Sequence, residues 1–138
     1  MAWSYAKKLN GQLAMVEKRR TSPSETKVQF VIGDVEGKNV ILTDDVIATG
    51  GSIVNAVKVL KEKGAKDVYL CAAHPVLAGP AVERLAAADV KQVVVTDTIP
   101  LPKRCPKGLF KVVSVAELFG EAIRRIHSNE SVSYLFKR

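Results

Sequence analysis

The sequence predicts an α/β fold in which a mostly parallel β-sheet is flanked by helices. Strand-like and helix-like segments alternate along the chain without any repeat or low-complexity tract, and such alternation is typical of parallel sheets covered by helices. The chain has 138 residues, of which 47% are hydrophobic, enough to build one sizeable core. We therefore expect a single domain that spans residues 1–138.

The first part of the chain indicates one helix and three strands. Residues 2–10 have the amphipathic pattern of a helix, and the apolar positions of residues 12–17 and the alternation of residues 28–32 are typical of strands. A polar segment with a proline, residues 19–26, separates these two strands and is expected to be a loop. Glu36 and Gly37 then turn the chain into a third strand, residues 39–43.

The middle of the chain continues the alternation. From Ser52 onward, Ile53, Val57 and Leu60 recur at helical spacing, and Gly64 is placed to end that helix, so Ser52 is expected to be its N-cap. The elements that follow are a strand at 67–72, a helix from about Pro80, a strand at 90–96, a loop at 99–108 and a strand at 110–113.

A helix closes the predicted fold. Ser114 and Glu117 have the spacing of a capping box. The apolar residues that follow are expected on the inner side of this last helix: Leu118, Phe119, Ala122, Ile123 and Ile126.

Charge and composition narrow the classes of partner. The net charge is +7, but the basic residues are spread over the predicted helices and lack the interleaved aromatic residues of a nucleic-acid platform, so small polyanions fit better. No apolar run reaches the ~18 residues of a membrane span, and no secretory signal is visible. Cys71 and Cys105 lack metal-binding spacing, which indicates reduced thiols and a cytoplasmic protein.

The most informative segment is an apolar run that ends in Asp44 and Asp45 and continues into a turn of small residues and a helix. The turn consists of Ala48, Thr49, Gly50, Gly51 and Ser52. Amides at such a turn and helix start can hold a phosphate, while carboxylates accept hydrogen bonds from ribose hydroxyls. Two acids alone could be a solvated strand end, and two glycines alone could be a simple turn. Their order together predicts a sugar-phosphate site.

This segment resembles the phosphoribosyl-diphosphate binding motif of the type I phosphoribosyltransferase fold. Two further segments, residues 72–85 and residues 131–136, are similar to ribose-phosphate diphosphokinase, also called phosphoribosyl-diphosphate synthetase. The resemblance covers essentially the whole chain but only the carboxyl-terminal half of that enzyme. Most bacterial and animal members of this family carry an aspartate where this chain has Ala48, and some archaeal members have a small residue there.

The resemblance implies a reaction and its site residues. ATP would donate a diphosphate group to the anomeric hydroxyl of ribose 5-phosphate, which gives phosphoribosyl diphosphate and AMP. Lys18 and Arg20 match catalytic positions of the family, and the predicted turn with Asp44 and Asp45 would bind ribose 5-phosphate. The family requires Mg²⁺, which these two acids would reach partly through water, without a closed protein metal site.

The carboxyl-terminal segment carries a second implication of the resemblance. In the family this segment contributes to a regulatory nucleotide or phosphate site between subunits, and the matching residues here are Ser131, Val132, Ser133 and Phe136. The alternative is that Tyr134 and Phe136 pack into an interface. The expected partners of the chain are further copies of itself or an amino-terminal half.

Two other functions remain open. The resemblance implies that the half supplying most adenine contacts is absent, so we expect weak or no turnover from the chain alone. One alternative is a non-catalytic regulatory or binding partner of a full-length synthetase, although the retained Lys18 and Arg20 argue against it. The chain could also be a phosphoribosyltransferase that modifies a base, although no separate segment for base recognition is visible.

Overall fold

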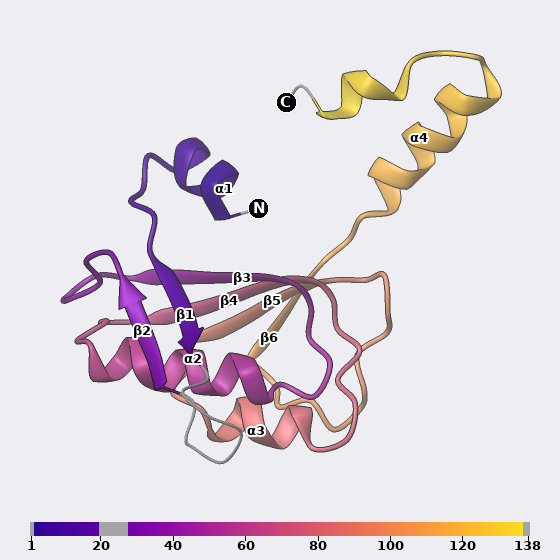
Figure 1. The fold of residues 1–138 in the computed structure, drawn as a ribbon. Helices are drawn as coiled ribbons and strands as arrows, with labels where there is room; N and C mark the ends of the chain where they lie inside the picture. Colours follow the sequence, from indigo (N-terminus) through magenta and orange to yellow (C-terminus); the bar gives the residue numbers. More distant parts are fainter. Residues whose placement is uncertain (1, 20–27, 137–138) are drawn as a thin grey trace.

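The computed structural model describes residues 2–19 and 28–136. Its main sheet contains four parallel strands in the order β3-β4-β5-β6, which confirms the predicted α/β fold with a mostly parallel sheet. The helices α2 and α3 connect β3 to β4 and β4 to β5, and both cover the same face of the sheet (Figure 1). These elements are β3 (Val40–Val46), α2 (Gly51–Glu62), β4 (Val68–His74), α3 (Ala81–Ala87), β5 (Gln92–Thr96) and β6 (Phe110–Val113).

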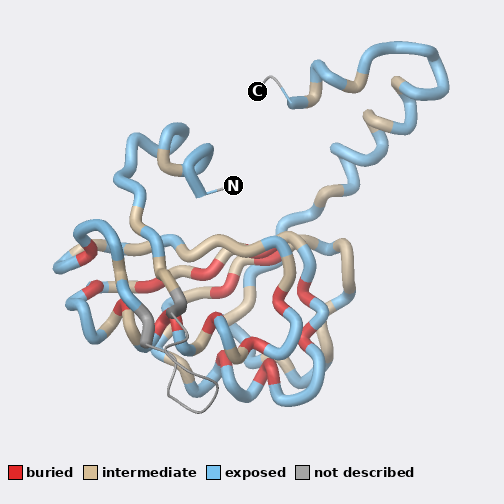
Figure 2. The backbone as a smooth tube through the Cα atoms, in the orientation of Figure 1, coloured by how far each residue is buried: buried red, intermediate tan, exposed pale blue. Residues whose placement is uncertain are grey.

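The core lies between this sheet face and the two helices. Side chains alternate across a strand, so Val68 and Leu70 of β4 and Val93 of β5 point to the helices and are fully buried, whereas their neighbours are only partly covered. Val57 and Leu60 of α2 meet them from the other side. Figure 2 shows the buried positions gathered in this layer, which fixes the carboxyl ends of β3, β4 and β5 relative to the start of α2.

The remaining elements lie outside this layer. A helix α1 (Ala2–Lys8) precedes an antiparallel hairpin of β1 (Met15–Arg19) and β2 (Val28–Ile32). After β6, α4 (Ala116–His127) and the 3₁₀ helix η1 (Val132–Phe136) lead away from the sheet, and α1 stands on the same side as they do (Figure 1). Neither α1 nor α4 has a buried residue among those described.

Several predicted boundaries near the site were displaced. Ser52 is not the N-cap of α2: the cap position is Gly50, with φ 72°, and no side chain of the described ranges caps the helix. Because Gly50 adopts this left-handed conformation, the chain turns into the helix two residues earlier than it would with Ser52 as the cap. Gly64, with φ 84°, ends the helix as predicted, and the Ala65 N–H donates to the carbonyl of Leu60 at 3.0 Å.

The prediction for the last helix was wrong in two respects. Its apolar side does not face inward, because Leu118, Phe119 and Ile123 are 50%, 57% and 66% exposed. The capping box does not form either, because the N-cap is Val115, whose N–H donates to Asp97 Oδ1 at 2.9 Å. An amphipathic pattern identifies the apolar side of a helix but not whether the chain contains something to cover it.

β1 also starts later than expected. The predicted strand was 12–17, and the observed strand runs Met15–Arg19, because its antiparallel register pairs Met15 with Ile32 and Arg19 with Val28. Within the two described ranges, each helix is either too short or too polar to cross a bilayer.

Candidate functional site

The two predicted acids lie within β3 at the carboxyl edge of the sheet. β3 extends three residues past its predicted end, through Asp44 and Asp45 to Val46. Asp44 pairs with Ala72 of β4. Its side chain is partly buried, on the face of the sheet that the helices cover, whereas Asp45 is exposed. The Asp45 N–H donates to Asp44 Oδ1 at 2.9 Å. The strand therefore fixes one acid as the more buried member of the pair.

The two carboxyl groups interact, and their pKa values move in opposite directions. Desolvation, followed by hydrogen bonding with the Asp45 side chain, raises the pKa of Asp44. Hydrogen bonding with Asp44 is the largest cause that lowers the pKa of Asp45. Asp45 therefore loses its proton at a lower pH than Asp44 and is the first of the two to accept hydrogen bonds as a carboxylate. Such a pair is suited to vicinal hydroxyl groups, which donate to carboxylate oxygens.

The turn after β3, residues 48–52, is named here the phosphate cradle. Carbonyl groups along it are fixed from one side: Ile47 O accepts from Leu77 N at 2.9 Å and Ala48 O from Ala78 N at 3.0 Å. Within the part of the chain that the structure describes, none of the five amides of the cradle has a hydrogen-bond acceptor. Five unpaired donors at the start of a helix, whose dipole is positive there, form an anion-binding arrangement.

Two hydroxyl groups add to these amides. Thr49 and Ser52 are both exposed, and neither side chain has a hydrogen-bond partner among residues 2–19 and 28–136. Gly50 is buried, and a Cβ there would lie 3.6 Å from the carbonyl oxygen of Ala81. Ala48 presents only a methyl group, so at this position the cradle depends on its main chain. The arrangement can bind a phosphate through neutral donors.

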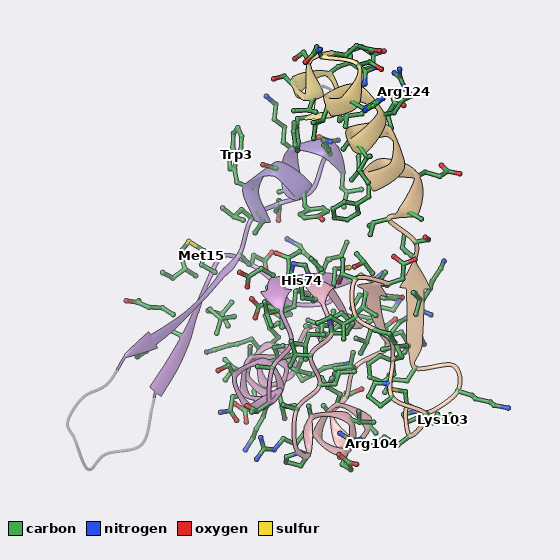
Figure 3. All side chains as sticks on the ribbon, turned by 90° about the vertical axis from the view of Figure 1, so that its right-hand side faces the viewer. Trp3, Met15, His74, Lys103, Arg104 and Arg124 are labelled. Carbon is green, nitrogen blue, oxygen red and sulfur yellow. The ribbon has the colours of Figure 1, made fainter. Side chains whose placement is uncertain are left out.

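The neighbouring strands bring polar groups to the same edge. His74 ends β4, and its Nδ1 lies 3.0 Å from Thr98 Oγ1, while Thr96 Oγ1 donates to the carbonyl of Ala73 at 2.7 Å. Figure 3 looks onto the carboxyl ends of the strands and shows His74 at this edge. No catalytic role for His74 follows from the sequence, and the parallel register that pairs it with Val46 brings it beside the acids.

The other predicted site residues belong to the hairpin, to the tail or to the part of the chain that is not described. Lys18 belongs to β1 and pairs with Gln29, and Arg20 falls outside the described residues. The tail forms η1, which lies away from the cradle in Figure 1. There the Ser133 N–H donates to Ser131 Oγ at 3.3 Å, and Val132 and Phe136 are the ends of the helix. The structure thus gathers the acids and the cradle but not the tail.

One cavity of about 490 Å³ lies on the opposite side of the sheet from α2. It is enclosed by α1, by the segment that follows it and by β3, including Ile41 and Thr43. No residue of the cradle lines it. No three His, Cys, Asp or Glu side chains of the described ranges gather closely enough to hold a metal ion. The cavity is therefore separate from the predicted phosphate site at the edge of the sheet.

Sequence reasoning missed the segment that fixes the cradle. Residues 74–78 make three main-chain hydrogen bonds with Ile47 and Ala48, accepting one and donating two. In addition, Arg84 Nη1 donates to the carbonyl of Thr49 at 3.0 Å. Arg84 is 35 residues from Thr49 in sequence. No local spacing marks such a contact, because it depends on how α3 packs beside α2.

The chain is similar to known proteins over nearly its whole length. A sequence profile described as the phosphoribosyl synthetase-associated domain matches residues 4–137. A ribose-phosphate pyrophosphokinase of Caldanaerobacter subterraneus is 52% identical over 132 residues, which cover 96% of this chain and 42% of that protein. The Bacillus subtilis protein of the same name is 47% identical over 131 residues, which cover 95% of this chain and 41% of that protein.

A solved structure is similar as well. The crystal structure of phosphoribosylpyrophosphate synthetase from Mycobacterium smegmatis superimposes with a TM-score of 0.83 at 41% sequence identity, over 91% of this chain and 40% of that one. The chain spans less than half the length of these relatives.

Proposed function

Since the chain belongs to the phosphoribosyl synthetase-associated domain family, we propose that it is the ribose 5-phosphate-binding part of a ribose-phosphate diphosphokinase. One observation carries the proposal: cradle amides without hydrogen-bond acceptors among the described residues lie at the same sheet edge as two interacting acids. A pentose monophosphate has complementary chemistry, with a phosphate at one end and vicinal hydroxyls at the other.

The roles proposed for the individual residues follow from this orientation. The amides of residues 48–52 and the hydroxyls of Thr49 and Ser52 bind the phosphate. Asp44 and Asp45 accept hydrogen bonds from the ribose hydroxyls and hold the ring, which fixes the position of the anomeric hydroxyl. Such positioning of two substrates can contribute about 7–11 kcal/mol to catalysis, more than one side chain supplies.

The proposed reaction is a diphosphate transfer. The anomeric oxygen of ribose 5-phosphate forms a bond to the β-phosphorus of ATP and loses its proton, while the bond from the β-phosphorus to the α-phosphate oxygen breaks and AMP leaves. Lys18 and Arg20 are proposed to neutralise the charge on the transferring group. Their part rests on the sequence resemblance, because Arg20 and the side chain of Lys18 are outside the described structure.

The proposed reaction uses Mg²⁺ as its cofactor. Asp44 and Asp45 offer the carboxylate oxygens that Mg²⁺ prefers, and two acids without a third ligand suit an ion that keeps several of its own waters. Bound Mg²⁺ would neutralise charge on the nucleotide phosphates. The protein residues would orient it only in part.

The rest of the ATP site is proposed to come from elsewhere. The chain corresponds to about 42% of its relatives, so an amino-terminal half, or a further copy of the chain, would complete the adenine contacts. The cytoplasmic location and the regulatory role of Ser131, Val132, Ser133 and Phe136 stay predictions. The exposure of Tyr134 and Phe136 (54% and 81%) is compatible with an interface at this tail.

A coupled assay tests the proposal against its two alternatives. AMP release from ATP and ribose 5-phosphate is measured with the chain alone and with an amino-terminal half supplied from a relative. Turnover that appears only on mixing supports the diphosphokinase half. Consumption of a free base and phosphoribosyl diphosphate would favour a phosphoribosyltransferase, and a change in a full-length synthetase without turnover would favour a regulatory partner.

A further inference from the structure

The orientation of each cradle amide is set by the carbonyl group of the residue before it. All peptide bonds in the described chain are trans, and in a trans peptide the C=O and N–H groups point to opposite sides. Donors from the segment after β4 hold the carbonyls of Ile47 and Ala48 on one side. The amides of Ala48 and Thr49 therefore point to the other side, into the cradle.

The Thr49–Gly50 peptide is held differently. Its carbonyl accepts from the guanidinium of Arg84, Nη1 to O at 3.0 Å, and no main-chain donor of the described residues reaches it. The first two carbonyls are fixed by main-chain groups that any residue would provide. The third is fixed by a side chain, so the amide of Gly50 depends on the identity of residue 84.

The position of Arg84 is itself fixed by the fold. The short helix α3 is anchored by Ala81, Val82 and Leu85, all buried in the core, and the Arg84 N–H donates to the carbonyl of Pro80 at 3.0 Å. Within the described residues, the guanidinium of Arg84 makes no ion pair, and the Thr49 carbonyl is its only hydrogen-bond acceptor. A Cβ at Gly51 would lie 3.7 Å from Arg84 Nη1, so the guanidinium lies against the cradle itself.

The adjoining segment shows that this side of the cradle is tightly determined. Leu77 is 2% exposed and has φ 48°, a conformation that a bulky side chain adopts only when its surroundings impose it. Arg104 Nη2 donates to the carbonyls of Leu77 at 3.2 Å and of Gly79 at 2.9 Å. The segment that supports Ile47 and Ala48 is thus braced independently of Arg84.

We propose that Arg84 is a positioning residue that turns the Gly50 amide toward a bound phosphate group. The inference rests on the proposed function, since the phosphate is that of a pentose monophosphate. Arg84 acts through the Thr49 carbonyl and stands behind the cradle rather than in it. Its positive charge also favours an anion nearby, and the experiment separates this effect from positioning.

The test compares Arg84→Ala, Arg84→Lys and Lys58→Gln in the 138-residue chain. Titration calorimetry with ribose 5-phosphate is expected to show about 10-fold weaker binding for Arg84→Ala, in line with the loss of a hydrogen bond from a charged group, and partial recovery for Arg84→Lys. Lys58 lies on the exposed side of α2, so Lys58→Gln removes one charge without touching the loop and is expected to bind as wild type does.

A second measurement tests the geometry without ligand. The amide resonances of Thr49 and Gly50 are expected to shift in ligand-free Arg84→Ala and to stay in place in Lys58→Gln, with thermal unfolding of each variant as a check of the fold. Unchanged resonances in Arg84→Ala, or equal weakening by Lys58→Gln, would overturn the inference. If the wild-type chain ignores ribose 5-phosphate, the proposed function fails, and the resonances still decide the role of Arg84.

Discussion

Replacing Thr49 by valine isolates the contribution of one hydroxyl group to the cradle. Valine has nearly the same shape, and the Thr49 hydroxyl has no partner among the described residues, so nothing inside the protein is lost. We expect the free energy of unfolding to change by less than about 0.5 kcal/mol. A hydrogen bond to a charged phosphate contributes about 1.5–3 kcal/mol, which corresponds to binding of ribose 5-phosphate weakened by about 10- to 150-fold.

The assay is calorimetric titration with ribose 5-phosphate, paired with urea unfolding. Thr43→Val is the matched control, because it removes the same hydroxyl from β3 on the cavity side, away from the cradle, and is expected to leave the affinity unchanged. The reasoning is refuted if Thr49→Val binds the sugar phosphate as tightly as wild type. Equal weakening in both variants would also refute it, because the effect would then not be local.

Three further predictions concern the acids, the core and the last helix. Asp45→Ala should weaken ribose 5-phosphate binding by about 10-fold or more in the same titration, and unaltered affinity would remove this acid from the site. Leu60→Ala, at a position 1% exposed, should lower the free energy of unfolding by about 2–5 kcal/mol in urea, whereas Ile123→Ala, at a position 66% exposed, should cost less than about 1 kcal/mol; similar losses would contradict the observed burial. Hydrogen bonding to Arg124 is the largest cause that lowers the pKa of Glu121 to about 2. Because this folded-state pKa lies below the unfolded value, the stabilisation of α4 is complete above the ordinary glutamate range and is lost as the pH falls toward about 2; an NMR titration of the Glu121 carboxyl with its midpoint near 4.5 would contradict the pairing.

The arrangement of the site could be predicted to a large extent from local sequence signals. An apolar run, two acids, a glycine pair and a helical repeat follow one another between Val40 and Leu60, and each signal acts within a few residues. The structure confirms the strand, turn and helix that they predict. The binding roles of Asp44, Asp45 and residues 48–52 stay predictions, because geometry alone does not identify a ligand.

The exact limits of these elements depended on interactions across the sheet. β3 continues to Val46 because Val46 pairs with His74 of β4, and a local pattern contains no information on that register. Similarly, the apolar side of α4 could be predicted from the spacing of Leu118 to Ile126, but this side is exposed in the structure. Periodicity shows which side of a helix is apolar, while burial requires a partner surface.

Residue preferences and short-range periodicity were sufficient to predict the fold class, the order of the elements and the position of the acids beside a glycine-containing turn. The direction in which the cradle amides point could not be predicted in this way. That direction depends on Leu77, Ala78 and Arg84, which the packing of α3 beside α2 brings to Ile47, Ala48 and Thr49. Hydrogen bonds between residues about 30 positions apart form only after the core has placed both segments.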